Sequence, residues 1–324
     1  MKETLLIALG GNALIKKGQR GSIEEQFENL RPPIQQIARL SEQYDIVITH
    51  GNGPQVGNLL LQQEKCPEVP TMPLEILVAQ TQGQIGYMIE STLDNELMKL
   101  GGNTKQLFVT VLTYVVVDID DPAFKNPSKP IGPFFSKEEA ERLPYPTVET
   151  ADGYRRVVAS PKPVTIVEKR EIERLLREGF LVIACGGGGI PVIRERRKFE
   201  GVDAVIDKDL ASAKLAREVG VDIFLIATDT QGVAINFKKP GQRFLRKLPL
   251  EEAKRLLQEG EFPEGSMGPK VEATIEFLER GGRRALITST ENIQRSVEGK
   301  AGTEIIRYSD THPRFVRNSR KSSP

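Results

Sequence analysis

One stretch constrains the fold of this chain more than any other, because an uncharged apolar run leads directly into glycines. The run is Phe180-Leu-Val-Ile-Ala-Cys185, and Gly186 to Gly189 follow it. Uncharged runs rich in β-branched residues are typical of strands that are covered on both faces, as in parallel sheets. Glycines at the carboxyl end of such a strand let a ligand approach the backbone, since no Cβ stands in the way. The stretch therefore predicts a buried parallel strand with a phosphate site at its end.

A lysine occupies an unusual position shortly after this turn. Asp207 is placed as the N-cap of a helix in which Ala211, Leu215 and Val219 have helical spacing, so Lys208 falls in the first turn. A cation is disfavoured at the positive end of a helix, but it can meet a bound anion or order a metal site there. We interpret Lys208 as a contact to an anion. A solvated surface turn is the alternative that this segment alone leaves open.

Two further apolar runs end in glycine-rich turns. Leu5-Leu-Ile-Ala-Leu9 precedes Gly10-Gly11-Asn12-Ala13, and Asp45-Ile-Val-Ile-Thr49 precedes His50-Gly-Asn-Gly-Pro-Gln-Val-Gly57. Backbone N–H groups in such turns can face a bound anion, although an ordinary strand-to-helix turn has a similar sequence. His50 could contact a ligand, but a single histidine at a strand end is more often a hydrogen-bonded structural residue.

Later strand ends carry polar and basic residues. The apolar run of residues 221–228 ends in Asp229-Thr230, which are placed to meet a nucleotide. The flexible turn Gly265-Ser-Met-Gly-Pro-Lys270 delivers Lys270 to the start of a helix over residues 271–280. Lys270 is thus a second lysine predicted at a helix start.

The segments between these turns have helical or strand-like patterns. Residues 22–43 form an amphipathic helix that Pro32 and Pro33 are expected to split or kink. Residues 74–100 predict a long helix that stops at Gly101-Gly102, and residues 249–259 predict a shorter one. We interpret residues 107–117 as one long strand, and residues 285–288 and 302–306 as short strands at the sheet edges.

Residues 118–163 depart from this alternation and are rich in proline and charge. We interpret them as an inserted subdomain or lid. Proline-framed turns can hold a cation such as Lys129 out over a site, and they equally suit an excursion without a catalytic role. The rest of the chain alternates strands and helices, which predicts an open three-layer α/β/α sandwich with a mostly parallel central sheet. Ligands are expected along its carboxyl edge.

Composition and missing motifs exclude several classes of function. With 45 Lys and Arg against 44 Asp and Glu, the chain lacks the broad positive field of a nucleic-acid or membrane-surface protein. Two cysteines and two histidines support neither a disulfide framework nor a zinc site. No apolar run approaches the roughly 20 residues that span a bilayer, so a cytoplasmic location is expected. The P-loop pattern G-x-x-x-x-G-K-[ST] and the dinucleotide-binding pattern G-x-G-x-x-G are both absent, which argues against these two kinds of nucleotide site. Glycine turns with separated lysines and aspartates fit direct phosphoryl transfer best.

The ordered motifs also resemble those of the carbamate kinases, in the amino acid kinase superfamily. The matching segments, spread over residues 2–306, are Gly10-Gly-Asn12, His50-Gly-Asn-Gly-Pro-Gln55, Lys129-Pro-Ile-Gly132, Tyr154-Arg-Arg156, Ser160-Pro-Lys-Pro163, Cys185-Gly-Gly-Gly-Gly-Ile-Pro191, Asp207-Lys-Asp209 and Gly265-Ser-Met-Gly-Pro-Lys270. The resemblance implies a homodimer that reversibly transfers a phosphoryl group between ATP and carbamate. The products would be ADP and carbamoyl phosphate, with Mg²⁺ accompanying the nucleotide.

Carried over by position, the resemblance implies roles for individual residues. The catalytic residues would be Lys129, Asp207, Lys208 and Lys270. The substrate and phosphoryl group would lie on Gly10, Gly11, Asn12, Gly51, Asn52 and Gly53. The nucleotide would be bordered by Gly186, Gly187, Lys208, Thr228, Asp229, Met267, Gly268 and Lys270. No metal ion is expected to be bound directly by protein side chains.

The resemblance also implies a division of the chain. Residues 1–308 would form the kinase domain, with a substrate lobe over about 1–177, the lid at 118–163 and a nucleotide lobe over about 178–308. Residues 309–324 would be a basic, polar, disordered tail outside the family pattern. Ala151-Asp152 precedes Gly153 where the family pattern suggests a bulkier residue.

Two alternatives remain at this point. One is a kinase of the same superfamily that acts on another small carboxylate, such as an N-acetylated amino acid. Such kinases usually have a lysine in the first glycine turn, where this chain has Asn12. The other is a module that senses ATP without turnover. Such a module would need neither Lys129 nor Lys208.

Overall fold

A computed structural model describes residues 2–101, 106–150, 152–263 and 266–307. The predicted tail at 309–324, the helix stop at Gly102, Ala151 and Gly265 lie outside the described residues. Every helix in the described ranges is too short or too polar to cross a membrane.

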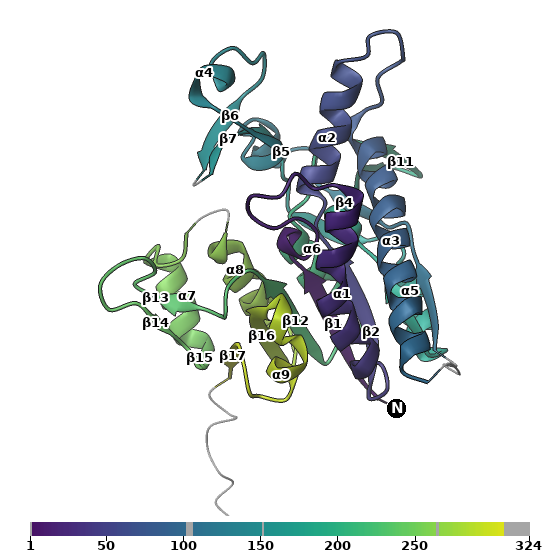
Figure 1. Cartoon of the computed structure of the whole chain (residues 1–324), viewed down its shortest axis with the longest axis vertical. Helices are drawn as coiled ribbons and strands as arrows, with labels where there is room; N and C mark the ends of the chain where they lie inside the picture. The colour runs from purple at the N-terminus through teal and green to yellow at the C-terminus, as the bar shows by residue number, and fades with distance from the viewer. Residues whose placement is uncertain (1, 102–105, 151, 264–265, 308–324) are drawn as a thin grey trace, which may run out of the picture.

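An eight-stranded sheet forms the centre of the molecule (Figure 1), with the strand order β15-β17-β16-β12-β1-β2-β9-β3. Its strands are β1 (Glu3–Leu9), β2 (Tyr44–His50), β3 (Leu107–Thr110), β9 (Phe180–Ile183), β12 (Ile223–Thr228), β15 (Lys247–Pro249), β16 (Arg284–Ser289) and β17 (Thr303–Ile306). All neighbouring strands are parallel except β16 and β17. The expectation that the last two strands lie at sheet edges is wrong, because β15 pairs with β17 and takes the edge position.

Helices cover both faces of this sheet, because side chains along each strand point alternately to opposite sides. In β1, Leu5, Ile7 and Leu9 join one apolar core and Leu6 and Ala8 join the other. The first core is covered by α1 (Ile23–Leu40), α3 (Leu74–Lys99) and α9 (Ile293–Val297). The second is covered by α5 (Lys169–Arg177), α6 (Lys208–Glu218), α7 (Leu250–Gln258) and α8 (Met267–Glu279). The predicted three-layer α/β/α architecture is confirmed.

The structure refines one helix prediction and corrects another. Of the two outcomes expected at Pro32 and Pro33, a split does not occur, because helix α1 is continuous, starts at a Ser22–Glu25 capping box and keeps its apolar face buried on the sheet. Helix α8 begins at Met267 rather than at residue 271, because a proline is tolerated in the first turn, where its missing N–H would be unpaired anyway. Lys270 therefore lies at the end of the first turn of α8.

A second sheet of four strands was not predicted. It consists of β4 (Tyr114–Val117), β8 (Pro163–Ile166), β10 (Ile190–Glu195) and β11 (Lys198–Gly201), in the order β11-β10-β4-β8. The prediction of one strand over residues 107–117 is wrong. The chain leaves the central sheet after Val111, whose N–H still bonds to Ile183, and the Thr113 N–H turns to the Gln82 side chain. Strand β4 then enters the second sheet.

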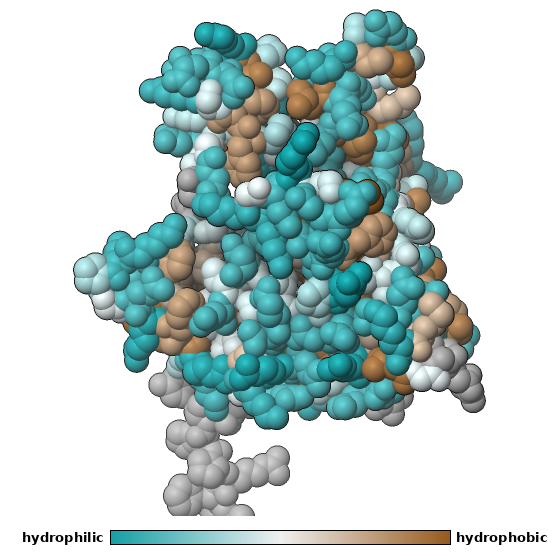
Figure 2. All heavy atoms as spheres, viewed as in Figure 1, coloured by the Kyte–Doolittle hydropathy of each residue, from teal (hydrophilic) through white to brown (hydrophobic). Residues whose placement is uncertain are grey.

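The segment interpreted as a lid carries its own small sheet, at the top of Figure 1. Its strands β5 (Lys129–Phe135), β6 (Thr147–Thr150) and β7 (Gly153–Val158) pair in the order β5-β7-β6, and α4 (Lys137–Ala140) connects β5 to β6. In the space-filling view an indentation of the left outline separates this part from the region of α7 (Figure 2). Figure 2 also shows apolar side chains over the lid, where Phe134 is exposed.

The lid sheet is joined to helix α2 (Gly53–Glu64) by direct backbone contact. A Cβ at Gly57 would lie 2.0 Å from the backbone nitrogen of Gly132 in β5. Gly132 has a φ of +72°, and its carbonyl accepts two hydrogen bonds from the Arg155 guanidinium, at 2.7 and 3.0 Å. The position of β5, and hence of Lys129 at its start, therefore depends on a glycine at position 57.

Gly57→Ala is expected to destabilise the protein by about 2 kcal/mol, because the new methyl group must push two backbones apart. The matched control is Gly83→Ala, another helical glycine, where a Cβ would meet nothing within 4 Å. That change should stabilise the protein by roughly 1 kcal/mol through helix propensity. Urea unfolding of both variants measures the contrast, and equal effects would show that α2 and β5 are not tightly packed.

Candidate active site

The glycine turn after β1 (the first turn, residues 10–13) and the one after β2 (the second turn, residues 50–57) lie next to the end of β12, at the carboxyl edge of the central sheet. They do so because β1 lies between β2 and β12. The N–H of Gly10 donates to Ala227 O at 2.8 Å, and the N–H of Gly51 donates to Leu9 O at 3.2 Å. The structure thus brings the predicted substrate turns together with Thr228.

Close packing explains why two positions in these turns are glycine, but it does not explain a third. A Cβ at Gly10 would lie 2.9 Å from Ala227 O, and one at Gly51 would lie 3.2 Å from Lys208 Cδ. Gly51 therefore makes room for the Lys208 side chain to cross the second turn. A Cβ at Gly11 would meet nothing within 4 Å, so open space lies in front of the first turn.

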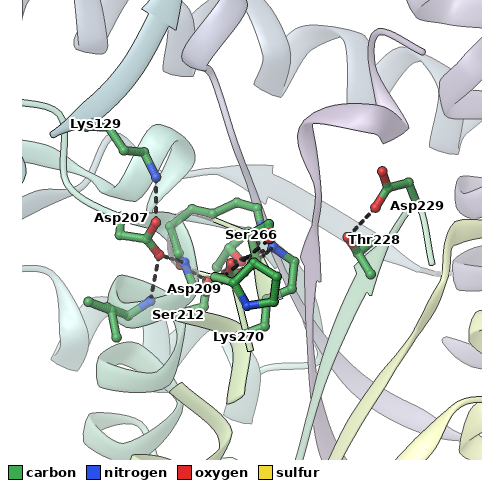
Figure 3. Close-up of polar contacts among 12 residues, drawn as sticks. Lys129, Asp207, Asp209, Ser212, Thr228, Asp229, Ser266 and Lys270 are labelled. Carbon is green, nitrogen blue, oxygen red and sulfur yellow. Dashed lines mark hydrogen bonds and ion pairs between the residues drawn. The ribbon is translucent and has the colours of Figure 1, made fainter. Parts of the chain in front are cut away.

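Three lysines and two aspartates form a charge cluster beside these turns (Figure 3). Lys129 Nζ lies 2.5 Å from Asp207 Oδ2, and Lys270 Nζ lies 3.2 Å from Asp209 Oδ2. Lys208 Nζ bonds to the other oxygen of Asp209. The lysines come from the lid, the start of α6 and the first turn of α8. All four predicted catalytic residues are thus in one cluster.

The cluster carries one more positive than negative charge in a largely buried place. Side-chain exposure ranges from 4% for Asp209 to 26% for Lys129. A surplus charge in such surroundings is costly unless an anion compensates it. The arrangement therefore suits a phosphate-bearing ligand, as the position of Lys208 at a helix start had indicated.

The pKa values of these groups follow from burial and from their neighbours. Burial alone would raise the pKa of the Asp207 carboxyl, but the charge and hydrogen bond of Lys129 hold it well below its usual range. Burial lowers the pKa of Lys208, and Lys270 adds to this, although Asp209 opposes it. Burial would also lower the pKa of Lys270, but the two aspartates, aided by Asp229, raise it. Asp207 and Asp209 thus oppose the effect of burial on the pKa values of Lys208 and Lys270.

Asp207 also fixes the backbone that carries Lys208. Its Oδ1 accepts hydrogen bonds from Asp209 N at 2.8 Å and Leu210 N at 3.3 Å, so it caps α6 as predicted. Its Oδ2 is bound to Lys129. One carboxylate therefore connects the start of α6 to the lid.

The remaining predicted nucleotide residues lie apart from the charge cluster. Figure 3 shows Thr228 and Asp229 to one side, at the end of β12, where Thr228 Oγ1 donates to Asp229 Oδ1 at 3.1 Å. Met267 and Gly268 occupy the first turn of α8, the same turn that carries Lys270. Lys270 thus connects the charge cluster to the residues predicted to border the nucleotide.

Gly186 and Gly187 have unexpected neighbours. A Cβ at Gly186 would lie 2.4 Å from His50 Nε2, and one at Gly187 would lie 2.2 Å from Asn52 Nδ2. Both glycines are buried, and Gly187 has a φ of +65°. Their nearest neighbours belong to the predicted substrate turn, so packing against that turn accounts for the glycines. Their contact with the nucleotide stays a prediction.

Similarity to known proteins agrees with this geometry. The model of the amino acid kinase family matches residues 3–289. Carbamate kinase from Thermococcus kodakarensis is 50% identical over 313 residues, which cover 94% of this chain and 99% of that protein. The chain belongs to the carbamate kinases of the amino acid kinase family. The structure of carbamate kinase from Giardia lamblia bound to AMP-PNP is 41% identical, with a TM-score of 0.85 over 94% of this chain and 99% of that one.

Two residues in this carbamate kinase family member were not singled out from its sequence as site residues. Asp209 binds both Lys208 and Lys270, and the Asp-Lys-Asp order around Lys208 was a signal that could have identified it. Arg155 supports the lid at Gly132 and lies over the Phe134 ring, 5.1 Å from its centre. Nothing in the spacing of the motifs pointed to that contact.

His50 is buried, and its ring bonds to the backbone of the neighbouring Gly51. Its Nδ1 lies 3.0 Å from Gly51 O, and since a carbonyl only accepts, Nδ1 carries the proton. Nε2 is buried without a hydrogen-bond partner among the described residues. Burial, together with the charge of Lys208, lowers the pKa of His50 from 6.5 to about 4, although the hydrogen bond to Gly51 O opposes this shift. The ring is therefore neutral at physiological pH.

This depressed pKa predicts acid sensitivity. The unfolded chain takes up a proton at His50 below pH 6.5, whereas the folded protein resists protonation until about pH 4, so stability falls between these values. Between pH 7 and pH 5 the free energy of unfolding should fall by about 2 kcal/mol more in the wild type than in His50→Asn, which cannot titrate. Urea unfolding at both pH values tests this. Parallel losses in the two proteins would contradict it.

Proposed function

We propose that this chain is a carbamate kinase that transfers a phosphoryl group between ATP and carbamate in both directions. The observation that carries the proposal is the charge cluster of Lys129, Lys208, Lys270, Asp207 and Asp209 beside two glycine turns. Direct phosphoryl transfer needs mainly positioning and neutralisation of charge, and this cluster supplies both. Membership in the carbamate kinases indicates the acceptor.

The proposed step is an in-line displacement. A carboxylate oxygen of carbamate attacks the γ-phosphorus of ATP, the bond from that phosphorus to the β,γ-bridging oxygen breaks, and ADP leaves with the electron pair. No proton has to move. The N–H groups of Gly11 and Asn12, with those of Asn52 and Gly53, would hold the acceptor and the phosphoryl oxygens. Gly10 and Gly51, whose own N–H groups bond to Ala227 O and Leu9 O, would line the same site and leave room for the ligand.

Each lysine has a proposed place in this step. Lys208 would contact the phosphoryl group in flight, because it crosses the second glycine turn at Gly51. Lys129 would approach from the lid, and Lys270 would bind the nucleotide phosphates from α8. Asp207 and Asp209 would orient the lysines through the ion pairs described above.

The nucleotide would lie over the end of β12 and the start of α8. Thr228, Asp229, Met267 and Gly268 would border it, together with Gly186 and Gly187 of the third glycine turn. Mg²⁺ accompanying the nucleotide would neutralise part of the charge of its phosphates. Asp207 and Asp209 are both engaged by lysines, so we propose that the metal ion is held by the phosphates rather than directly by protein side chains.

The proposal divides the chain into a substrate lobe and a nucleotide lobe, with a boundary near residue 177, and a lid over about residues 118–163.

We also propose that the protein acts as a homodimer. The exposed apolar side chains of Ile76, Tyr87 and Met98 on α3 would favour association of two copies. Light scattering of the purified protein measures the molar mass and decides between one copy and two.

A comparison of phosphoryl donors tests the proposed acceptor. Carbamoyl phosphate should convert ADP to ATP much faster than acetyl phosphate or N-acetylglutamyl phosphate does. Asn12 in place of a lysine in the first glycine turn supports this preference over the N-acetylated amino acid kinases. Equal or faster turnover with an acyl phosphate would assign the chain to another carboxylate. Binding of ADP without turnover of any donor would favour a sensing module.

A further inference from the structure

A pair of buried hydroxyl groups connects the central sheet to the start of α6. Thr49 Oγ1 in β2 and Ser212 Oγ in α6 lie 2.6 Å apart, and both residues are fully buried. Ser212 Oγ also lies 2.5 Å from the backbone carbonyl oxygen of Lys208. Because that carbonyl only accepts, Ser212 donates to it and Thr49 donates to Ser212. The three groups form one chain of hydrogen bonds from β2 to the backbone of Lys208.

The surroundings of this pair are apolar, so its presence needs an explanation. Ala8 is the register partner of Thr49 in β1, and Ala211 and Ala213 flank Ser212; all three alanines belong to the same apolar core. A buried hydroxyl costs free energy when it is unpaired, and two apolar residues could fill the same space. A hydrogen bond is directional, however, and it fixes the relative position of two elements more closely than apolar packing does.

The same end of β2 also contacts the Lys208 side chain. Gly51, two residues after Thr49, leaves the space through which Lys208 Cδ passes. Thr49 therefore fixes the backbone of Lys208 through Ser212, and Gly51 leaves the path for its side chain. Figure 3 shows Ser212 beside Asp207 and Asp209, which the same helix carries. One strand end thus sets the distance between the second glycine turn and Lys208.

We propose that Thr49 and Ser212 are positioning residues that hold Lys208 at the transfer distance from the second glycine turn. This inference rests on the proposed function. Neither hydroxyl needs to touch the substrate, because both act through the backbone of Lys208. A shift of about 1 Å in a group that stabilises the transferred phosphoryl group can cost up to a hundredfold in rate.

Substitutions at Thr49 separate positioning from stability. Thr49→Val keeps the shape but removes the hydroxyl, and we expect kcat to fall roughly tenfold while both KM values stay within about twofold. Thr49→Ser keeps the hydroxyl but loses a buried methyl group, so it should lower the Tm more and kcat less. Thr49→Val should therefore be the less active but more stable variant, and Thr49→Ser the more active but less stable one.

Ser212→Ala and a control complete the design. Ser212→Ala should lower kcat at least as much as Thr49→Val does, because it also removes the bond to Lys208 O. The double variant should be no worse than Ser212→Ala alone, since that variant has already lost the Thr49–Ser212 bond. The matched control is Thr92→Val in α3, whose buried hydroxyl bonds to Met88 O at 2.7 Å in its own helix. That variant should keep the wild-type kcat. A Thr49→Val enzyme with wild-type kcat, or losses of kcat that follow Tm across all variants, would overturn the proposal.

A readout without turnover keeps this test independent of the proposed function. The side-chain ε resonances of Lys208, assigned by comparison with Lys208→Arg, report the surroundings of that lysine in the free protein. They should shift in Thr49→Val and in Ser212→Ala but not in Thr92→Val. Unchanged resonances in the first two variants would refute the positioning role, even if the wild type proves to act on another acceptor.

Discussion

Lys208→Ala is expected to lower kcat/KM for ATP formation roughly a hundredfold, which corresponds to about 3 kcal/mol of transition-state stabilisation. Lys208 is largely buried, bonds to Asp209 and passes over Gly51 beside the first two glycine turns. In such surroundings a fixed cation acts with little screening, and water entering the space cannot replace its charge. Most of the loss should therefore be in kcat, with ADP binding retained.

The control for this change lies in the same helix. Lys214 is half-buried in α6, and the charged groups around it are Lys169, Arg217, Glu218 and Glu276 rather than the cluster. Lys214→Ala should leave the rate within about threefold of the wild type. Lys208→Ala within threefold of the wild type would remove Lys208 from the mechanism, and similar losses in both variants would point to a general loss of folding.

Asp209→Asn should have the second largest effect, because this carboxylate is the shared partner of two buried lysines. It binds Lys208 and Lys270 and is only 3% exposed. Removing one member of a buried ionic network leaves its partners uncompensated, which costs about 3 kcal/mol of folding stability. The loss should be smaller when ATP is bound, since the phosphates then compensate the lysines.

The same substitution should change how the rate depends on pH. Burial already lowers the pKa of Lys208, and the charge of Asp209 opposes that effect. Without Asp209 the pKa of Lys208 falls further. As the pH is raised, Lys208 then loses its proton at a lower pH than in the wild type, and the enzyme loses its activity at that lower pH too. The matched control is Glu218→Gln, which removes a carboxylate that is 3.6 Å from Lys169 at the other end of α6. Only Asp209→Asn should move the alkaline limb of the pH–rate profile. An unshifted limb would show that Asp209 does not maintain the charge of Lys208.

Periodicity and glycine turns predicted the layers of the fold, because strands covered on both faces contain uninterrupted apolar runs. The central strands Leu5–Leu9 and Phe180–Ile183 are of this kind, and they lie where the sequence placed them. The N-cap at Asp207 was also predictable, since capping is a local property of the chain. These features depend on neighbours in the sequence rather than on distant contacts.

Features that depend on distant partners were not predictable. The break between β3 and β4 is set by a bond from the Thr113 N–H to Gln82, 31 residues away. The order of strands that places β15 at the edge is likewise a matter of pairing. Gly186 and Gly187 could be identified as special, but only the fold shows that His50 and Asn52 lie against them. Composition cannot reveal which side chain will fill the space that a glycine leaves.

The most direct test of the account is the initial rate of ATP formation from Mg²⁺-ADP and carbamoyl phosphate, measured with the wild type and Lys208→Ala side by side. We expect rapid ATP formation by the wild type and its near loss in the variant, while calorimetry shows that both proteins bind ADP. A folded wild-type protein that binds ADP but forms no ATP would contradict the assignment of carbamate as the acceptor. A wild-type protein that fails to bind ADP would contradict the kinase mechanism itself.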